Sequence, residues 1–284
     1  MKKIIHILSL FCAFLATACT QMGLGVVNLP THFNDITVSK DIAFGPEPWQ
    51  KMDIYTPPGG GEKRLPVIVF YYGGRWESGS KDDYRFVGSA LASKNYIVVI
   101  PDYRKYPQVK FPAFVQDAAR SLAWVDTHIG EYGGDHRAIH VSGHSAGAHI
   151  ASLLTVDPRY LKAEGKDRSK VIRDFVGLAG PYDFVPDEKD LQDMFGPPSQ
   201  YSQMQATTFI DGRQPPMLLL WGDRDQYVGK INMDHMTAAI GKKGGRVETH
   251  IYPGIDHIRL IANLSWIGPA DNPVLSDWMS FIGK

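Results

Sequence analysis

The feature that most constrains the fold of this 284-residue chain is a series of short apolar runs in which polar and apolar residues do not alternate. β-Branched residues are frequent in these runs, and proline, glycine or asparagine bounds the first two of them. Strands of this composition are expected in a parallel sheet that helices cover on both faces. The runs are residues 67–71, 97–100, 138–142, 175–178 and 217–221.

Segments with helical spacing lie between these runs. In residues 113–129 the apolar side chains recur at the spacing of one helix face, and Pro112 stands where a first turn can begin. Residues 145–156 and 232–242 are further candidate helices. Because strands and helices alternate along the chain, we expect an α/β fold with a mostly parallel, doubly wound sheet that is flanked by helices.

The predicted domain begins after residue 34. Alternating patterns in residues 35–44 and 51–55 predict antiparallel strands at the N-terminal start of the sheet. No internal repeat or low-complexity tract follows, so residues 35–284 are expected to form one domain. Within it, proline, glycine and glutamine interrupt the alternation at about 183–214, which predicts an excursion from the sheet and a candidate cap.

Residues 1–18 have the features of a secretory signal peptide. Lys2 and Lys3 precede an apolar stretch that is too short to span a bilayer, and small residues follow it. Cys19 then lies where a bacterial lipoprotein signal places the cysteine that receives a lipid. We therefore expect export, a membrane anchor through a lipid on Cys19, and a tether over residues 19–34. Ordinary cleavage, which releases a periplasmic or secreted protein, is the alternative.

Charge balance and cysteine count argue against several kinds of partner and site. The chain has 30 basic and 30 acidic residues and no run of like charges, so we expect no nucleic acid partner. Both cysteines, Cys12 and Cys19, lie in the leader region, which leaves the mature body without an internal disulfide. His136, His140 and His144 cross a loop, a strand and a turn, so they cannot share one helix face, and we predict no metal site.

Ser145 is the candidate nucleophile. It is the centre of Gly143-His144-Ser145-Ala146-Gly147, which follows a predicted strand directly and opens a helical stretch. Such a sharp turn strains the central residue, and the flanking glycines remove Cβ atoms that would collide with neighbouring backbone. The hydroxyl is then presented beside a helix N-terminus, which favours developing negative charge. A glycine and serine turn that serves only packing is the alternative.

Two adjacent glycines, Gly73 and Gly74, follow the first long apolar run and are candidates for an oxyanion hole. Their backbone N–H groups, together with that of Ala146, are predicted to bind the oxyanion of a tetrahedral intermediate. A hairpin turn is the alternative, although a turn after a buried parallel strand should lead into a crossover.

The acid and the base are expected downstream of the nucleophile, in that order, each in a loop after a strand. Two aspartates follow the last of the apolar runs, and we choose Asp225 as the acid and Asp223 as the alternative. His257 lies in a predicted loop after the strand of residues 246–252 and is the predicted base, which takes the nucleophile's proton and returns it to the leaving group. His250 alternates within that strand and is expected to be structural.

Taken together, these motifs resemble the esterase/lipase group of α/β-hydrolases related to hormone-sensitive lipase, especially its bacterial carboxylesterase and kynurenine formamidase-like branches. The resemblance runs from about Lys51 to the C-terminus. Its landmarks are Gly73-Gly74-Arg75-Trp76 with Gly79 and Lys81, Pro101-Asp102-Tyr103-Arg104 with Tyr106-Pro107, Phe111-Pro112-Ala113 with Asp117, the serine turn, Gly222-x-x-Asp225 and Asp256-His257.

The resemblance implies the α/β-hydrolase fold and hydrolysis of a carboxylic ester or an arylformamide through an acyl-enzyme, with no metal or cofactor. One position departs from the family pattern, in which the oxyanion segment usually begins His-Gly-Gly, because Tyr72 stands in place of the histidine. The change keeps the backbone donors of Gly73, Gly74 and Arg75, but another group must brace the loop.

We predict a carboxylesterase for small or medium acyl groups, acting on a small-molecule ester or amide. Trp76, Phe184, Phe195, Tyr201 and the excursion are candidates for an apolar wall or cap, although each aromatic residue suits core packing as well. The enzymatic alternatives are an arylformamidase and a peptidase of the prolyl-oligopeptidase kind, which the absence of a preceding propeller domain disfavours. A catalytically silent, surface-displayed binding protein is disfavoured by the complete set of nucleophile, acid and base.

Overall fold

The computed structural model describes residues 26–32, 35–62, 64–269 and 271–283. Within them the chain builds one sheet with the strand order β1-β2-β4-β3-β5-β6-β7-β8. Strand β2 pairs antiparallel with β1 and β4, whereas the other neighbouring pairs are parallel. The expected sheet, mostly parallel with antiparallel strands at its N-terminal start, is therefore confirmed. The strands are β1 Thr37–Ala43, β2 Lys51–Thr56, β3 Leu65–Tyr71, β4 Ile97–Pro101, β5 Gly134–His144, β6 Ile172–Leu178, β7 Met217–Gly222 and β8 Val247–Tyr252.

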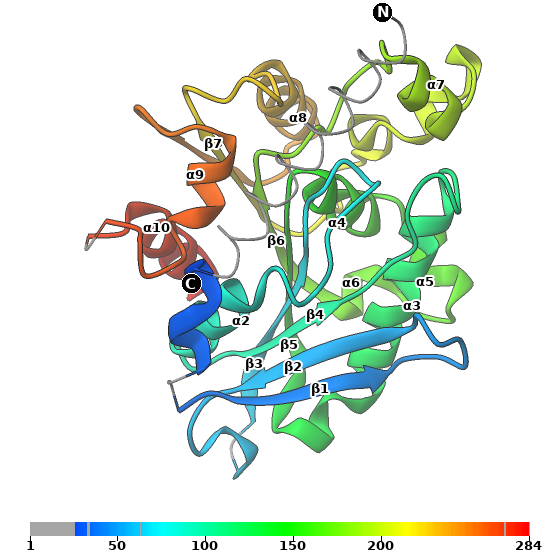
Figure 1. Ribbon diagram of the computed structural model, residues 1–284. Helices are drawn as coiled ribbons and strands as arrows, with labels where there is room; N and C mark the ends of the chain where they lie inside the picture. The colour runs from blue at the N-terminus through cyan, green and yellow to red at the C-terminus, as the bar shows by residue number, and fades with distance from the viewer. Residues whose placement is uncertain (1–25, 33–34, 63, 270, 284) are drawn as a thin grey trace, which may run out of the picture.

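Helices cover both faces of the sheet (Figure 1), with α2 and α10 on one face and α3 and α4 on the other. The three predicted helices are present as α3, α4 and α8, each displaced by one residue at one end. Among the described residues, no helix has the length and apolar character needed to cross a bilayer. The helices are α2 Arg85–Ala92, α3 Ala113–His128, α4 Ala146–Val156, α5 Pro158–Ala163, α6 Arg168–Val171, α7 Lys189–Phe195, α8 Ile231–Lys242, α9 His257–Ala262 and α10 Pro273–Ile282.

Burial along the strands explains why their apolar runs were recognisable. Every residue of β4 and β7 is buried, because each of these strands has a neighbour on both sides and helices above and below. At the edge of the sheet, β8 has exposed and half-buried positions instead, and only its last residue, Tyr252, is buried. The serine turn, the glycine pair and the two aspartates all follow interior strands, so the sheet places them at its carboxyl edge.

The excursion predicted at about 183–214 leaves the sheet after β6 and returns to it at β7. It contains α7 and two 3-10 helices, Pro198–Gln203 and Ala206–Phe209. Phe195 and Met204 within it are buried, which ties the segment to the body of the domain.

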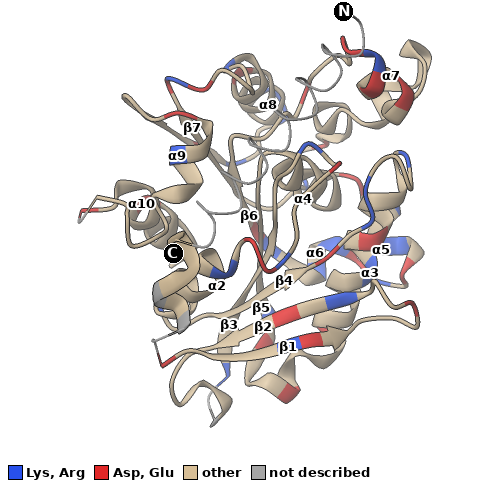
Figure 2. Ribbon diagram, in the orientation of Figure 1, with Lys and Arg blue, Asp and Glu red and all other residues tan. Residues whose placement is uncertain are grey.

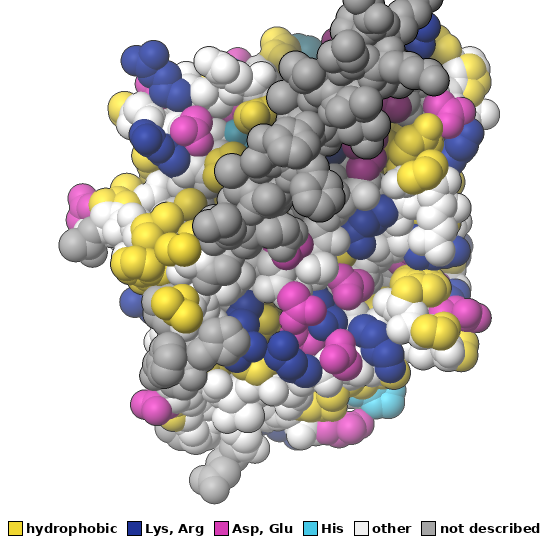
Figure 3. All heavy atoms as spheres, in the orientation of Figure 1, with side chains coloured by type: hydrophobic (Ala, Val, Ile, Leu, Met, Phe, Trp, Pro, Cys, Tyr) yellow, Lys and Arg dark blue, Asp and Glu magenta, His cyan; other side chains and the backbone are white. Residues whose placement is uncertain are grey.

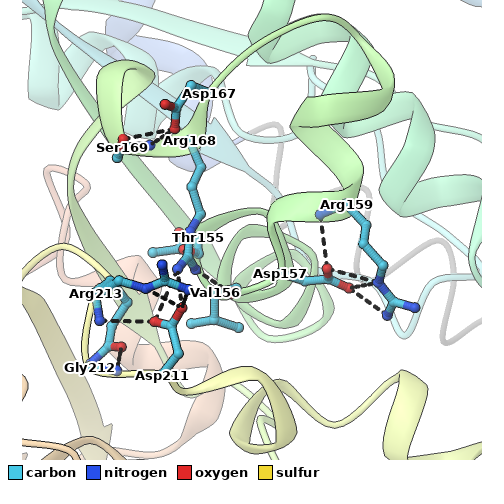
Figure 4. A network of polar contacts seen from close by, with 11 residues as sticks. Thr155, Val156, Asp157, Arg159, Asp167, Arg168, Ser169, Asp211, Gly212 and Arg213 are labelled. Atoms are coloured by element: carbon cyan, nitrogen blue, oxygen red, sulfur yellow. Dashed lines mark hydrogen bonds and ion pairs between the residues drawn. The ribbon is translucent and has the colours of Figure 1, made fainter.

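A polar network at the C-terminal end of α4 holds the last residues of the excursion against this helix (Figure 4). The buried guanidinium of Arg168 donates to the carbonyls of Thr155 and Val156, whose oxygens have no partner further along the helix. The same guanidinium donates to both carboxylate oxygens of Asp211, at 3.1 and 3.0 Å. Arg168 therefore links the C-terminal end of α4 to the end of the excursion.

The predicted leader, residues 1–18, and Cys19 lie outside the described residues. Residues 26–28, which the sequence analysis placed in a tether, lie on the surface of the domain. The side-chain oxygen of Asn28 accepts the Phe86 N–H at 2.8 Å, and the Trp266 indole donates to the Val26 carbonyl at 3.2 Å. On the face shown in Figure 3, basic and acidic side chains are interspersed, in keeping with the net charge of zero.

Candidate active site

Ser145 occupies the sharp turn that joins β5 to α4. Its backbone has φ 55° and ψ −124°, a conformation that residues other than glycine rarely adopt and that typically costs about 1–3 kcal/mol. Backbone hydrogen bonds hold this turn, because the Ser145 N–H donates to the Leu178 carbonyl at 2.9 Å and its carbonyl accepts the His149 N–H at 3.1 Å. The strained conformation expected for the nucleophile is therefore present.

The glycines on either side of the serine are required by close backbone contacts. A Cβ atom on Gly143 would lie 2.5 Å from the backbone of Gly147. A Cβ atom on Gly147 would lie 2.0 Å from the carbonyl oxygen of Tyr71, at the end of β3. The absence of side chains at these two positions thus lets α4 pass directly behind the carboxyl end of β3.

The structure brings Asp225 to His257. The carboxylate oxygen Oδ2 of Asp225 lies 2.7 Å from Nδ1 of His257, and the Asp225 side chain is fully buried. Its other oxygen accepts the N–H groups of Tyr227 and Val228, both at 2.9 Å. Asp223, the alternative acid, is exposed and accepts the Gly254 N–H at 2.6 Å instead. Asp225 is therefore the aspartate that contacts the histidine.

His257 was predicted to lie in a loop, but it is the first residue of α9. The helix begins there because the Asp256 carboxylate accepts the Arg259 N–H at 2.8 Å and caps the first turn. The backbone carbonyl of His257 accepts a hydrogen bond from Nε2 of His144 at 3.2 Å. Burial holds the pKa of His144 well below its usual value, so this imidazole is neutral and its Nε2 carries the proton.

The glycine loop lies directly against the nucleophile. A Cβ atom on Gly73 would lie 3.0 Å from the Cβ of Ser145. The Gly73 N–H, however, donates to the hydroxyl of Tyr84 at 3.2 Å, and this hydroxyl lies 3.4 Å from Nδ1 of His144, to which it can donate in turn. Gly74 has φ +133°, and a Cβ there would lie 2.3 Å from the Ser78 carbonyl oxygen, so only glycine fits.

Of the three predicted oxyanion donors, the N–H groups of Gly74 and Ala146 have no acceptor among the described residues, whereas that of Gly73 is engaged by Tyr84. Tyr84 and His144, which contact the glycine loop and His257, were not predicted from the sequence as residues of this site. Tyr84 lies eleven residues after Gly73, on no recognisable motif, and His144 occupies a variable position of the serine turn. No sequence pattern identifies either of them.

Tyr72 itself braces the loop in which it replaces the family's histidine. Its hydroxyl donates to Oδ1 of Asp102 at 2.7 Å, and the same oxygen accepts the backbone N–H of Lys81 at 3.0 Å. The buried ring stacks between those of Tyr103 and Tyr84, with centroid distances of 4.6 and 5.7 Å. The bracing that the sequence left unassigned thus comes from a tyrosine stack and one shared carboxylate.

Three of the four aromatic residues proposed for an apolar wall come together. Trp76 stacks on Phe184 at a centroid distance of 5.5 Å and meets Phe195 edge-on at 4.9 Å. His149, one turn beyond Ser145 on α4, meets the same indole at 5.2 Å. Burial lowers the pKa of His149 to about 4, so this imidazole is neutral near pH 7. Tyr201 is buried but makes none of these ring contacts.

Two surface pockets lie away from Ser145. The larger, about 640 Å³, is bordered by α7 and the residues that follow it, and the smaller, about 380 Å³, lies beside α5. Neither is lined by Ser145, Asp225 or His257. Among the described residues, no group of three or more histidine, cysteine, aspartate or glutamate side chains is arranged to hold a metal ion.

A family model described as BD-FAE matches residues 52–239 of the chain. Among curated proteins, the chain is similar to a probable isoprenylcysteine alpha-carbonyl methylesterase, ICMEL1, of Arabidopsis thaliana, with 28% identity over 89% of this chain and 59% of that protein. It is also similar to the esterase LipQ of Mycobacterium tuberculosis, with 26% identity over 78% of this chain and 58% of that protein. The chain thus spans less than two thirds of the length of these relatives.

Solved esterase structures share the fold. Esterase B from Lactobacillus rhamnosis superposes with a TM-score of 0.78 at 17% identity, covering 100% of this chain and 96% of that one. Esterase 2 of Thermogutta terrifontis, phosphoramylated by tabun, gives a TM-score of 0.70 at 23% identity, covering 87% and 95%. At these identities the likeness establishes the α/β-hydrolase fold expected from the sequence.

Proposed function

Because the chain belongs to the BD-FAE family of α/β-hydrolases, we propose that it is a serine hydrolase that cleaves carboxylic esters of small or medium acyl groups. The observation that carries the proposal is the 2.7 Å contact between Asp225 and His257, in a chain whose Ser145 is held at φ 55°. The printed names of the curated relatives, a methylesterase and an esterase, support the same chemistry.

In the proposed reaction, Asp225 accepts the Nδ1–H of His257, which leaves Nε2 free to take the proton of the Ser145 hydroxyl. The serine oxygen attacks the ester carbonyl carbon, and His257 returns the proton to the departing alcohol. Water then attacks the acyl-enzyme in the same way, releases the acid and restores the serine. The neutral His144 holds the backbone of His257 and takes no proton.

We assign the oxyanion to the N–H groups of Gly74 and Ala146. The Gly73 N–H donates to Tyr84, so Gly73 contributes chiefly by bringing the loop within van der Waals distance of Ser145. Donors of this kind matter because the loss of one typically lowers kcat by about 10²–10³.

A panel of p-nitrophenyl esters, from acetyl to dodecanoyl, tests the proposal with Ser145→Ala as the control. We expect turnover of the shorter esters by the native protein and none above background by the variant. Equal turnover by both proteins, or none by either, would exclude esterase chemistry at Ser145. Preferential turnover of N-formylkynurenine would move the substrate from esters to arylformamides.

For the N-terminus we propose lipidation of Cys19 and attachment to a membrane. The support is the sequence alone, an apolar leader followed by small residues and cysteine. Mass spectrometry of the mature N-terminus in a bacterial host tests this proposal. A diacylglycerol-modified Cys19 is expected, and an unmodified cysteine would contradict the anchor.

A further inference from the structure

The loop that carries Gly74 continues in an unusual backbone conformation. Arg75 and Trp76, which follow the glycine directly, have φ of 56° and 60°. Residues other than glycine rarely adopt such values, and two in succession persist only where the surroundings fix them. The contacts of these two side chains therefore identify what holds the loop in shape.

Arg75 is held by three carboxylates. Its guanidinium donates to Glu77 at 2.8 Å, to Glu188 at 2.9 Å and to both oxygens of Asp190. Glu77 belongs to the same loop, but Glu188 and Asp190 lie more than one hundred residues away, at the start of α7. Figure 2 shows the acidic residues of this helix.

Trp76 is held from the same direction. Its indole packs against Phe184, which precedes α7, and against Phe195, the last residue of that helix; both belong to the excursion of residues 183–214. The body of the domain contacts Trp76 as well: its ring meets His149 of α4 at 5.2 Å and Phe114 of α3 at 6.4 Å, and its carbonyl accepts the Tyr106 N–H at 2.9 Å. Both residues with positive φ after Gly74 thus contact the same segment, the excursion, which is distant in the sequence.

We propose that Arg75 is a positioning residue, and that its ion pairs with Glu188 and Asp190 make the excursion a brace for the oxyanion loop. This inference rests on the proposed function, because it assumes that the Gly74 N–H binds the oxyanion and that the brace keeps this N–H group in the right orientation. A looser loop still admits the ester but stabilises the developing oxyanion less well, so the effect falls on kcat.

Two substitutions test the contact between Arg75 and Asp190, one at each partner. Arg75→Ala removes the guanidinium but keeps a residue that, like arginine, disfavours positive φ. Asp190→Asn keeps the guanidinium and removes the negative charge on the α7 side of the ion pair. We expect each to lower kcat for p-nitrophenyl acetate by about ten- to a hundredfold, with KM changed less than about twofold. The double variant should lose no more than the worse single variant, because both remove one interaction.

Lys110→Met is the matched control. It removes another ion pair of α7, between Lys110 Nζ and Asp193 at 2.6 Å, and leaves in place the hydrogen bond from the Tyr106 hydroxyl to Asp193. Its kcat should stay at the native value, and thermal unfolding of each variant checks that the fold is retained. Arg75→Lys keeps the charge without the two-pronged geometry and should recover part of the lost kcat.

The results separate this inference from the proposed function. Turnover that survives in Ser145→Ala overturns the proposed function. Turnover that requires Ser145 but is unaffected by Arg75→Ala or by Asp190→Asn overturns the brace alone. An equal loss in Lys110→Met also overturns it, since the effect would then belong to α7 in general. The rate of Ser145 labelling by a fluorophosphonate should follow kcat across the series.

Discussion

Asp223 and Asp225 lie two residues apart, yet their surroundings give them different tasks. The side chain of Asp225 is fully buried, and backbone N–H groups fix one of its oxygens while the other meets His257. Asp223 is exposed, accepts the N–H of Gly254 and lies 4.0 Å from the guanidinium of its neighbour Arg224. The buried carboxylate of Asp225 can therefore orient the imidazole of His257, whereas the exposed carboxylate of Asp223 stabilises a turn.

Asp225→Asn should therefore lower kcat by about 10⁴, because an amide in this position favours the wrong imidazole tautomer. Asp223→Asn, the matched change, should leave kcat within about threefold of the native value, since it alters only a turn contact and an exposed ion pair with Arg224. Steady-state kinetics with p-nitrophenyl acetate compares them. Similar losses in the two variants would contradict the assignment of Asp225.

Among the structural elements, the loop after β3 depends on contacts that cross the fold. The Tyr72 hydroxyl, the Asp102 carboxylate and the Lys81 N–H meet at one oxygen, and the ring of Tyr72 lies between two others. The loop is thus tied to the end of β4 and to its own continuation. Its shape is set by these ties rather than by local backbone preference.

Removing the hydroxyl in Tyr72→Phe should lower the free energy of unfolding by about 1–3 kcal/mol, because a partly buried hydrogen bond to a carboxylate is lost. Tyr227→Phe is the control, because this residue is 80% exposed and the loss of its hydroxyl should cost less than about 0.5 kcal/mol. Urea unfolding measures both. Equal stabilities of Tyr72→Phe and the native protein would show that the hydroxyl does not brace the loop.

Some of these elements could be predicted from the sequence, and others could not. Strands β3 to β7 were predictable because burial on both faces leaves a continuous apolar run, and the sharp turn at Ser145 was predictable because its glycines are forced by backbone contacts. The contact between Gly73 and Tyr84 was not predictable, since it depends on where a distant side chain packs. The brace on Arg75 joins residues 113 and 115 positions apart, which no local pattern records.

In the molecule as a whole, histidines are buried in neutral form beside the site. His149 is fully buried, and its Nε2 meets the Met204 carbonyl at 2.7 Å. Because burial lowers its pKa from the usual 6.5 to about 4, the unfolded chain binds a proton here at a higher pH than the folded protein does. His144 shifts in the same direction. Acid therefore favours the unfolded state.

We expect the free energy of unfolding to fall as the pH is lowered from about 6.5 towards 4, by roughly 1.4 kcal/mol per pH unit for one such histidine. Urea unfolding at several pH values measures the slope. His149→Gln should reduce this slope, whereas His128→Gln, at a partly exposed position at the end of α3, should not. A native stability that stays flat across this window would contradict the neutral, buried state of His149.

The central claim is that the strained Ser145 is the nucleophile of an ester hydrolase. Mass spectrometry of the native protein after treatment with a fluorophosphonate tests it most directly, because the reagent bonds to an activated serine and marks its position. A single adduct on the peptide that contains Ser145, formed in step with the loss of ester turnover, is the predicted result. Complete loss of turnover with the adduct on another residue, or full turnover without any adduct on Ser145, would contradict the claim.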